Sequence, residues 1–176
     1  MYLPSASRSR YLRLLSPLVL AISLFSANAV SGDAAGMQGI VDLRSEAQVL
    51  ESENLILVLE FSSEYCAYCR KLESLFLLPM QRNAAYGDKI LIRTISLDAH
   101  ETVVDLEGRT VSTSEFASRY GVSLTPTLLF LNAEGIEMSE RLVGIWSEDF
   151  YGGFIDNRID EARHRLGQFE LAKTKL

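Results

Sequence analysis

The chain has 176 residues, of which 48% are hydrophobic and 23% are charged, a balance that can build one ordinary domain with a full apolar core. Its formal net charge is -6, so it is not expected to follow phosphate groups or anionic lipid, and no nucleic acid partner is predicted.

The first 29 residues have the three parts of a secretory signal peptide. Arginines at positions 8, 10 and 13 precede an apolar run over residues 14–25, and Ala-Asn-Ala at 27–29 is a small-x-small cleavage site. The apolar run is shorter than the ~20 residues of a spanning helix, which favours cleavage after Ala29 over an uncleaved anchor. Cleavage would remove three arginines and no acid, taking the net charge from -6 to -9. We therefore expect an exported, periplasmic protein whose residues 30–38 are flexible.

The first half of the domain shows alternating strand and helix signals. Residues 39–43 are expected to form a short edge strand, and the S-x-x-Q capping-box spacing that starts at Ser45 predicts a helix to about residue 52. The aliphatic run at 55–61 is typical of a central strand buried on both faces. Helical spacing follows over residues 66–78, and Pro79 is expected to end or kink that helix.

The second half continues the pattern. The expected segments are a buried strand at 89–97, a hairpin-like stretch at 102–112, a helix from Ser112 to Tyr120, strands at 127–131 and 137–143, and a long helix from about 147. The alternation predicts an α/β domain with a mostly parallel sheet and helices on both faces. A four-residue turn at 132–135 makes the last two strands antiparallel, so the sheet is mixed. The domain is expected over residues 39–168, followed by a tail at 169–176.

Cys66 and Cys69 are the only cysteines, and they stand where the predicted central strand meets the helix. A disulfide between them would close too short a loop to restrict the unfolded chain, so redox chemistry is favoured over a structural staple. At a helix N-terminus the unpaired N–H groups and the dipole lower a thiol pKa, which makes Cys66 the predicted nucleophile. Cys69, one turn further, is expected to be more buried and to resolve the mixed disulfide.

A zinc site is the competing interpretation of a C-x-x-C pair. It would require a second pair of ligands, but His100 and His164 are far apart in the sequence and no other cysteine exists. No G-x-G-x-x-G or P-loop spacing occurs either. The chain is therefore expected to hold no metal and no organic cofactor, with the dithiol itself as the redox centre.

Three separated motifs resemble the thioredoxin-like superfamily. Residues 58–69 resemble its active-site segment, in which a hydrophobic strand carries a buried acid, then Phe, then a short loop with an aromatic residue before the first Cys. Residues 122–131 are similar to its cis-proline loop and the strand that follows, and Gly144 resembles its glycine near the redox site. The motifs occur in the family's order and the match covers roughly residues 40–165. The resemblance implies a thioredoxin fold with the C-x-x-C at a helix N-terminus.

The resemblance also implies a substrate-binding surface. Pro126 would follow a cis peptide bond, and Thr125 would present its backbone and hydroxyl to the nucleophilic sulfur while the loop pairs with the substrate strand. An ordinary trans turn before a strand is the alternative for Pro126. The residues assigned to substrate binding are Tyr65, Ala67, Tyr68, Thr125, Pro126 and Gly144.

Glu60 lies in an otherwise apolar strand, where an unpaired carboxylate is costly. The resemblance implies that this acid moves the proton of Cys69, and burial should raise its pKa, which suits that role. The alternative is that Glu60 points to a strand end or pairs with Arg70 or Lys71.

Several features depart from cytosolic thioredoxins. Tyr65 replaces the usual Trp, and Ala67-Tyr68 replaces the usual Gly-Pro between the cysteines, a dipeptide that tunes the redox potential. The Cys-x-Tyr-Cys pattern, the late Pro79 and the insert at 102–112 resemble periplasmic SoxW-type thioredoxins. That resemblance implies a thiol–disulfide oxidoreductase that reduces disulfides of specific partner proteins, with a membrane thiol-reductant transporter as electron donor. We expect the protein to be a monomer.

Two other functions stay open from the sequence. One is a DsbA-like disulfide oxidant, although the chain has no room for the large helical insertion of such proteins. The other is a non-catalytic thioredoxin-fold binding or chaperone module, against which the intact cysteine pair argues. A peroxidase is a weaker candidate, because Arg70 has the position of an ordinary surface residue of the thioredoxin helix.

Overall fold

The structure is a computed structural model that describes residues 37–98 and 101–175, so the expected signal peptide and most of the segment 30–38 lie outside the described residues. The described elements are α1 (Leu43–Glu53), β1 (Ile56–Ser62), α2 (Ala67–Leu72), the π-helix η1 (Glu73–Leu77), α3 (Leu78–Arg82), the 3₁₀ turn η2 (Ala84–Tyr86), β2 (Ile90–Ser96), β3 (Thr102–Val104), β4 (Thr110–Ser112), α4 (Thr113–Arg119), β5 (Thr127–Leu131), β6 (Leu142–Val143) and α5 (Tyr151–Lys173).

Four strands form a mixed central sheet in the order β2-β1-β5-β6, and β3 and β4 form a separate hairpin. β1 is parallel to β2 but antiparallel to β5, which is in turn antiparallel to β6. The prediction of a mostly parallel sheet was therefore wrong. The connection between β2 and β5, residues 97–126, contains the β3–β4 hairpin as well as α4, so it is not the simple strand–helix–strand crossover on which the prediction depended.

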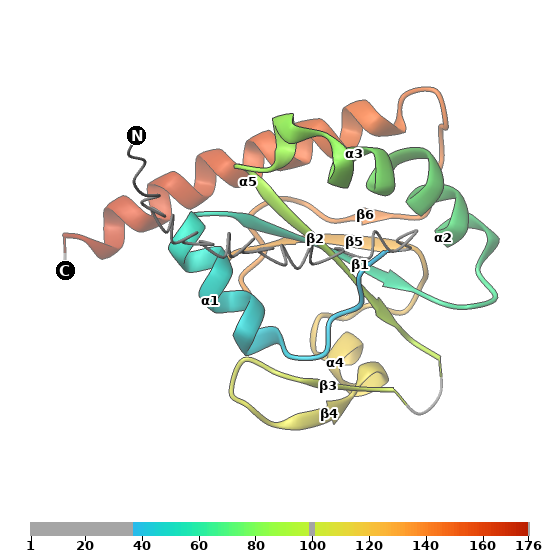
Figure 1. Cartoon of the computed structure of the whole chain (residues 1–176), viewed down its shortest axis with the longest axis horizontal. Helices are drawn as coiled ribbons and strands as arrows, with labels where there is room; N and C mark the ends of the chain where they lie inside the picture. Colours follow the sequence, from blue (N-terminus) through green and yellow to red (C-terminus); the bar gives the residue numbers. More distant parts are fainter. Residues whose placement is uncertain (1–36, 99–100, 176) are drawn as a thin grey trace, which may run out of the picture. The chain divides into compact units, whose positions relative to one another are not determined.

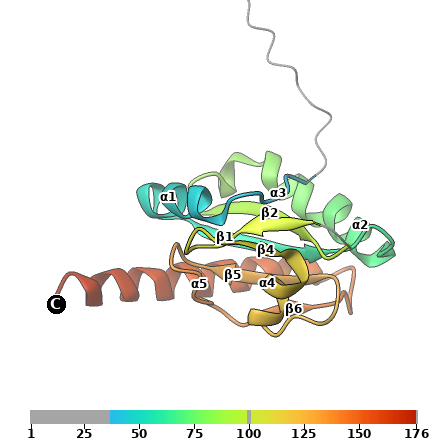
Figure 2. The same ribbon diagram turned by 90° about the horizontal axis from the view of Figure 1, so that it is seen from below.

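Helices cover both faces of this sheet, as expected (Figure 1). All seven residues of β1 are buried, and their alternation divides the core. Ile56 and Val58 pack with residues of α2, α3 and α5, whereas Leu57, Leu59 and Phe61 pack with α1, α4 and the hairpin. This alternation places Glu60 on the face covered by α2 and α5. Figure 2 shows α5 running past the edge of the sheet towards the C-terminus, and residues 169–173 of the expected tail are helical.

Two predicted strands are shorter than expected. In the segment 39–43 only isolated bridges from Gly39 and Asp42 form, because α1 already begins at Leu43. Asp42, not Ser45, is its N-cap, since the Asp42 carboxylate accepts bonds from two backbone N–H groups of the first turn. The strand expected at 137–143 is divided into a bridge at Glu137 and the two-residue β6.

Pro79 neither ends nor breaks the helix that begins after Cys66. The chain remains helical through η1 to the end of α3 at Arg82, and Pro79 occupies the first turn of α3. In η1 the N–H of Leu78 bonds to the carbonyl of Glu73, five residues back. This wider turn accommodates a proline, which lacks an N–H and would clash with the carbonyl four residues earlier in a regular helix.

Asp105 connects the β3–β4 hairpin, which the sequence predicted, to α4. The Asp105 side chain is 1% exposed and accepts bonds from Arg109 Nε at 3.0 Å, from the Arg109 backbone N–H at 2.8 Å and from Arg119 at 2.7 Å. Burial alone would raise the pKa of Asp105, but the hydrogen bonds from Arg119 and Arg109 outweigh it and lower the pKa to about 2.

Replacing Asp105 with asparagine is expected to lower the melting temperature by several degrees at pH 7 and to flatten its acid dependence. A carboxyl whose pKa is lowered on folding contributes stability above its unfolded pKa of 3.8 and loses it as the pH falls towards about 2. Thermal unfolding between pH 2 and 7 measures this, with the exposed Asp88→Asn as control. Identical acid slopes in wild type and Asp105→Asn would contradict it.

Candidate active site

Cys66 and Cys69 form a disulfide at the start of α2, with their Cα atoms 5.2 Å apart. Cys66 is the N-cap of the helix, and its Sγ accepts a hydrogen bond from the backbone N–H of Cys69 at 3.0 Å. Cys66 is partly exposed, whereas Cys69 is 1% exposed. The prediction of a C-x-x-C at a helix start is confirmed, and of the two cysteines only Cys66 is accessible to solvent.

The loop that leads into Cys66 is held by Asp98, a residue that the sequence analysis missed. The Asp98 carboxylate accepts bonds from the backbone N–H of Glu64, from Ser63 Oγ at 3.0 Å and from Ser96 Oγ at 3.0 Å. The bond from the Glu64 backbone is the main reason that the pKa of Asp98 is lowered. On the other side, Arg70 donates to the carbonyl of Glu64 at 2.9 Å. The only signal for Asp98 in the sequence is that it is an acid directly after the strand predicted at 89–97.

The loop before β5 contains a cis peptide bond between Thr125 and Pro126, as the resemblance implied. Thr127 Oγ1 donates to the carbonyl of Leu124 at 2.7 Å, and the N–H of Gly144 donates to the carbonyl of Pro126 at 2.8 Å. Phe61 pairs with Thr127 across the β1–β5 ladder. Pro126 and Gly144 therefore lie at the end of the sheet where β1 leads into the cysteine loop.

Glu60 is buried without a counter-charge. Its side chain is 0% exposed, and neither carboxyl oxygen has a hydrogen-bond partner within the described part of the chain. Burial first, and the nearby charge of Glu73 second, raise the pKa of Glu60 to about 9, so the carboxyl is neutral at pH 7. Glu60 does not pair with Arg70 or Lys71, the alternative that the sequence left open. Arg70 bonds to the Glu64 carbonyl, and Lys71 bonds to Glu148 at 2.6 Å.

Glu73 is a second acid near Glu60 that the sequence analysis did not identify. It lies in η1 four residues after Cys69, which places the two residues on one side of the helix. It accepts a bond from Ser62 Oγ at 3.3 Å, and Ser62 lies two residues after Glu60 on the same face of β1. The spacing from Cys69 was the available signal, but it is also the ordinary spacing of an exposed helix residue.

The remaining residues assigned to substrate binding divide by exposure. Tyr65 is 84% and Tyr68 is 59% exposed, and Ala67 between the cysteines is also exposed. Thr125 is half-buried and Pro126 is buried. The three exposed residues are sequence neighbours of the partly exposed Cys66, so all of them are open to solvent.

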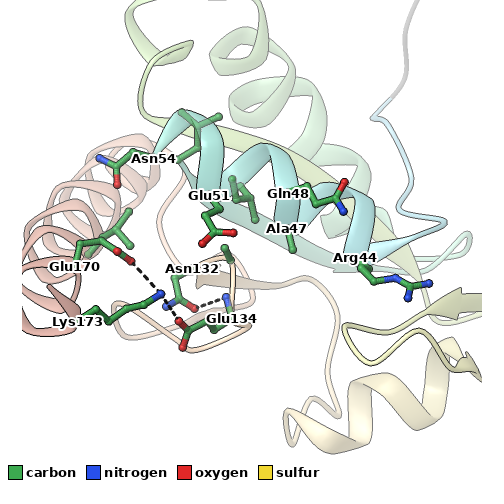
Figure 3. Close-up of a pocket in the computed structure, with 13 residues that line it drawn as sticks. Arg44, Ala47, Gln48, Glu51, Asn54, Asn132, Glu134, Glu170 and Lys173 are labelled. Atoms are coloured by element: carbon green, nitrogen blue, oxygen red, sulfur yellow. Dashed lines mark hydrogen bonds and ion pairs between the residues drawn. The ribbon is translucent and has the colours of Figure 1, made fainter. Parts of the chain in front are cut away.

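A separate pocket of about 220 Å³ lies between α1, the turn after β5 and the end of α5 (Figure 3). It includes the ion pair of Lys173 with Glu134 at 2.8 Å, and none of the predicted site residues lines it. In the described residues there is no group of three or more His, Cys, Asp or Glu side chains placed to hold a metal ion. None of the described helices is both long enough and apolar enough to cross a membrane.

The fold and this site together define a thiol–disulfide redox centre, in which two cysteines can exchange two electrons by opening and closing one disulfide. Residues 43–156 match the family model of the thioredoxin-like domain, and the chain therefore belongs to the thioredoxin-like family. No curated protein matches the chain.

Solved structures with a similar fold include bacterial and eukaryotic proteins. The C-terminal domain of DsbD from Neisseria meningitidis, in its oxidised form, is 14% identical over 68% of this chain and 98% of its own, with a TM-score of 0.46. The periplasmic thioredoxin SoxS from Paracoccus pantotrophus is 18% identical over 61% and 98%, with a TM-score of 0.43. A thioredoxin from Malassezia sympodialis is 17% identical over 73% and 95%, with a TM-score of 0.47.

Proposed function

We propose that this protein is an exported, monomeric, SoxW-type thiol–disulfide oxidoreductase that reduces disulfides of specific partner proteins in the periplasm. The observation that carries the proposal is the pairing of a partly exposed Cys66 with a fully buried Cys69 at the start of a helix, beside a buried neutral acid. The signal-peptide pattern at residues 1–29 supports export.

The reaction begins with attack of the Cys66 thiolate on a substrate disulfide, which forms a mixed disulfide and releases one substrate thiolate. Cys69 then loses its proton and attacks Cys66 Sγ, which releases the second substrate thiol and leaves the Cys66–Cys69 disulfide. Glu60 is neutral at pH 7, so its carboxyl first releases its proton to solvent, and the resulting carboxylate takes the Cys69 proton in this step. The closed Cys66–Cys69 disulfide and a Glu60 with a pKa of about 9 are what this step would leave.

Restoring the dithiol requires two electrons and two protons from another dithiol. We propose a membrane thiol-reductant transporter as that donor. The direction of electron transfer distinguishes this function from that of a DsbA-like oxidant. A reduction potential near the ~-270 mV of thioredoxin supports the reductase, and one near the ~-120 mV of DsbA overturns it.

Trapping tests the function and identifies the substrates. The Cys69→Ser variant is expected to accumulate mixed disulfides between Cys66 and substrate cysteines, because the resolving thiol is absent. Non-reducing electrophoresis of a periplasmic extract, followed by mass spectrometry, measures the trapped partners.

The matched control is Cys66→Ser, which retains only the buried cysteine and should trap nothing. Capture by Cys66→Ser in place of Cys69→Ser would reverse the assigned roles. If neither variant captures a partner and Cys66→Ser retains full function in cells, the non-catalytic binding module is the better description.

A further inference from the structure

Tyr151 is a buried residue of α5 that neither the motifs nor the proposed chemistry uses. It is the first residue of the helix and is 0% exposed, although the residue before it, Phe150, is 70% exposed. Its hydroxyl donates a hydrogen bond to the carbonyl of Gly144 at 2.7 Å. Burial, and secondly the charge of Glu60, raise the pKa of Tyr151, so the hydroxyl keeps the proton that it donates.

Gly144 connects this hydroxyl to the cis-proline loop. Its carbonyl accepts the bond from Tyr151, and its N–H donates to the carbonyl of Pro126 at 2.8 Å. Gly144 has a φ of +68°, a conformation that glycine adopts without strain, and it directly follows the two-residue strand β6. So short a strand provides few ladder bonds, and the hydroxyl of Tyr151 adds a second hydrogen bond to Gly144 beside that of its N–H to Pro126.

The ring of Tyr151 contacts the redox helix. Its centroid lies 5.5 Å from that of Phe76 in η1, which continues from the helix that begins after Cys66, and 5.1 Å from that of Trp146. Tyr151 therefore contacts the cysteine-bearing helix through its ring and the Pro126 loop through its hydroxyl and Gly144.

We propose that Tyr151 is a positioning residue that holds Gly144, and through it the Thr125–Pro126 loop, in the conformation that binds the backbone of a protein substrate. The inference rests on the proposed function. A loop that must be ordered on binding weakens affinity, so loss of the hydroxyl raises KM for substrates that pair with the loop. Small disulfides that reach only Cys66 are not affected.

The test compares Tyr151→Phe with Tyr86→Phe. Tyr86 provides a matched control, because its hydroxyl donates a bond of the same length, 2.7 Å, to Asp156 on the same helix α5, yet it is not connected to Pro126. In reduction of insulin disulfides, Tyr151→Phe is expected to raise KM roughly 3- to 10-fold with kcat unchanged. Reduction of a small aromatic disulfide should stay within about twofold of wild type, and Tyr86→Phe should behave as wild type in both assays.

Hydrogen exchange of the Gly144 amide provides a readout that does not depend on activity. Exchange should be faster in Tyr151→Phe than in wild type and unchanged in Tyr86→Phe. Equal KM values and equal Gly144 exchange in the two variants would overturn the proposal. If wild type itself fails to reduce insulin, the proposed function is wrong, and the Gly144 exchange still decides the role of Tyr151.

If Tyr151→Phe does not fold, 4-fluorophenylalanine at position 151 fills the volume of the hydroxyl without a donor, and 4-aminophenylalanine restores a donor. Faster Gly144 exchange with the fluoro group and wild-type exchange with the amino group support the proposal. Equal exchange in these two proteins overturns it.

Discussion

Replacing Glu60 with leucine is expected to raise the free energy of unfolding by about 3 kcal/mol at pH 7 and to impair turnover at the same time. The carboxyl is 0% exposed and has no hydrogen-bond partner in the described part of the chain, and its pKa rises from 4.5 to about 9 on folding. Each pKa unit corresponds to about 1.4 kcal/mol, and the interval between the unfolded pKa of 4.5 and pH 7 spans 2.5 units. The acid is thus retained at a cost in stability, as expected of a group with a chemical role.

The stabilisation should depend on pH in a defined direction. Between pH 4.5 and about 9 the folded state keeps the Glu60 proton and the unfolded state does not, so this group makes the protein less stable as the pH rises. Urea unfolding of wild type and Glu60→Leu should therefore give similar free energies at pH 4 and increasingly different ones towards pH 9.

Two controls sharpen this experiment. Glu60→Gln keeps a polar side chain but cannot titrate, so its pH slope should match that of Glu60→Leu. Glu53→Gln, at an exposed position of α1, should leave the wild-type slope unchanged. A wild-type stability that does not fall between pH 5 and 9 relative to Glu60→Gln would show that Glu60 is not neutral in the folded protein.

In the reduced protein, iodoacetamide is expected to modify Cys66 on the order of 100-fold faster than Cys69. Cys66 is partly exposed and its Sγ accepts the N–H of Cys69, an interaction that favours the thiolate, whereas Cys69 is 1% exposed. Peptide mapping by mass spectrometry after short alkylation pulses measures the two rates. Because Cys66 is the more accessible and more reactive thiol, we also expect the Cys66→Ser variant to lose all reduction of protein disulfides.

Alkylation in 8 M urea is the control, since both cysteines should then react at similar rates. Faster modification of Cys69 than of Cys66 in the folded protein would contradict the assignment of the nucleophile.

Much of the site could be predicted because its signals are local. The aliphatic run at 55–61 and the strand predicted at 89–97 correspond to β1 and β2 within one residue at each end. β1 is buried on both faces, and β2 has buried and half-buried residues, so both are rich in aliphatic side chains. The serine cap at Ser112 and the C-x-x-C at a helix start depend on residues only three apart. The Thr125–Pro126 loop was identified by its resemblance to the thioredoxin-like family, and the structure shows its peptide bond to be cis.

Other features depend on contacts between residues that are distant in the sequence. Asp98, Glu73 and Tyr151 are ordinary polar or aromatic residues in the sequence, and they acquire a role only when packing brings them to Glu64, Glu60 and Gly144. The burial and raised pKa of Glu60 were expected from its apolar strand, whereas its possible pairing with Arg70 or Lys71 was decided only by the fold, in which both bond elsewhere.

The sequence by itself therefore determined that a dithiol redox centre stands at a helix start, because this is a local arrangement, and it predicted which thiol attacks. Only the tertiary structure decided the direction of β5, the helix that continues through Pro79 and the neutral state of Glu60. Strand direction depends on the path that the connecting segment takes through the fold, and the pKa of a buried acid depends on which groups the fold brings within range. Neither quantity is contained in the spacing of residues along the chain.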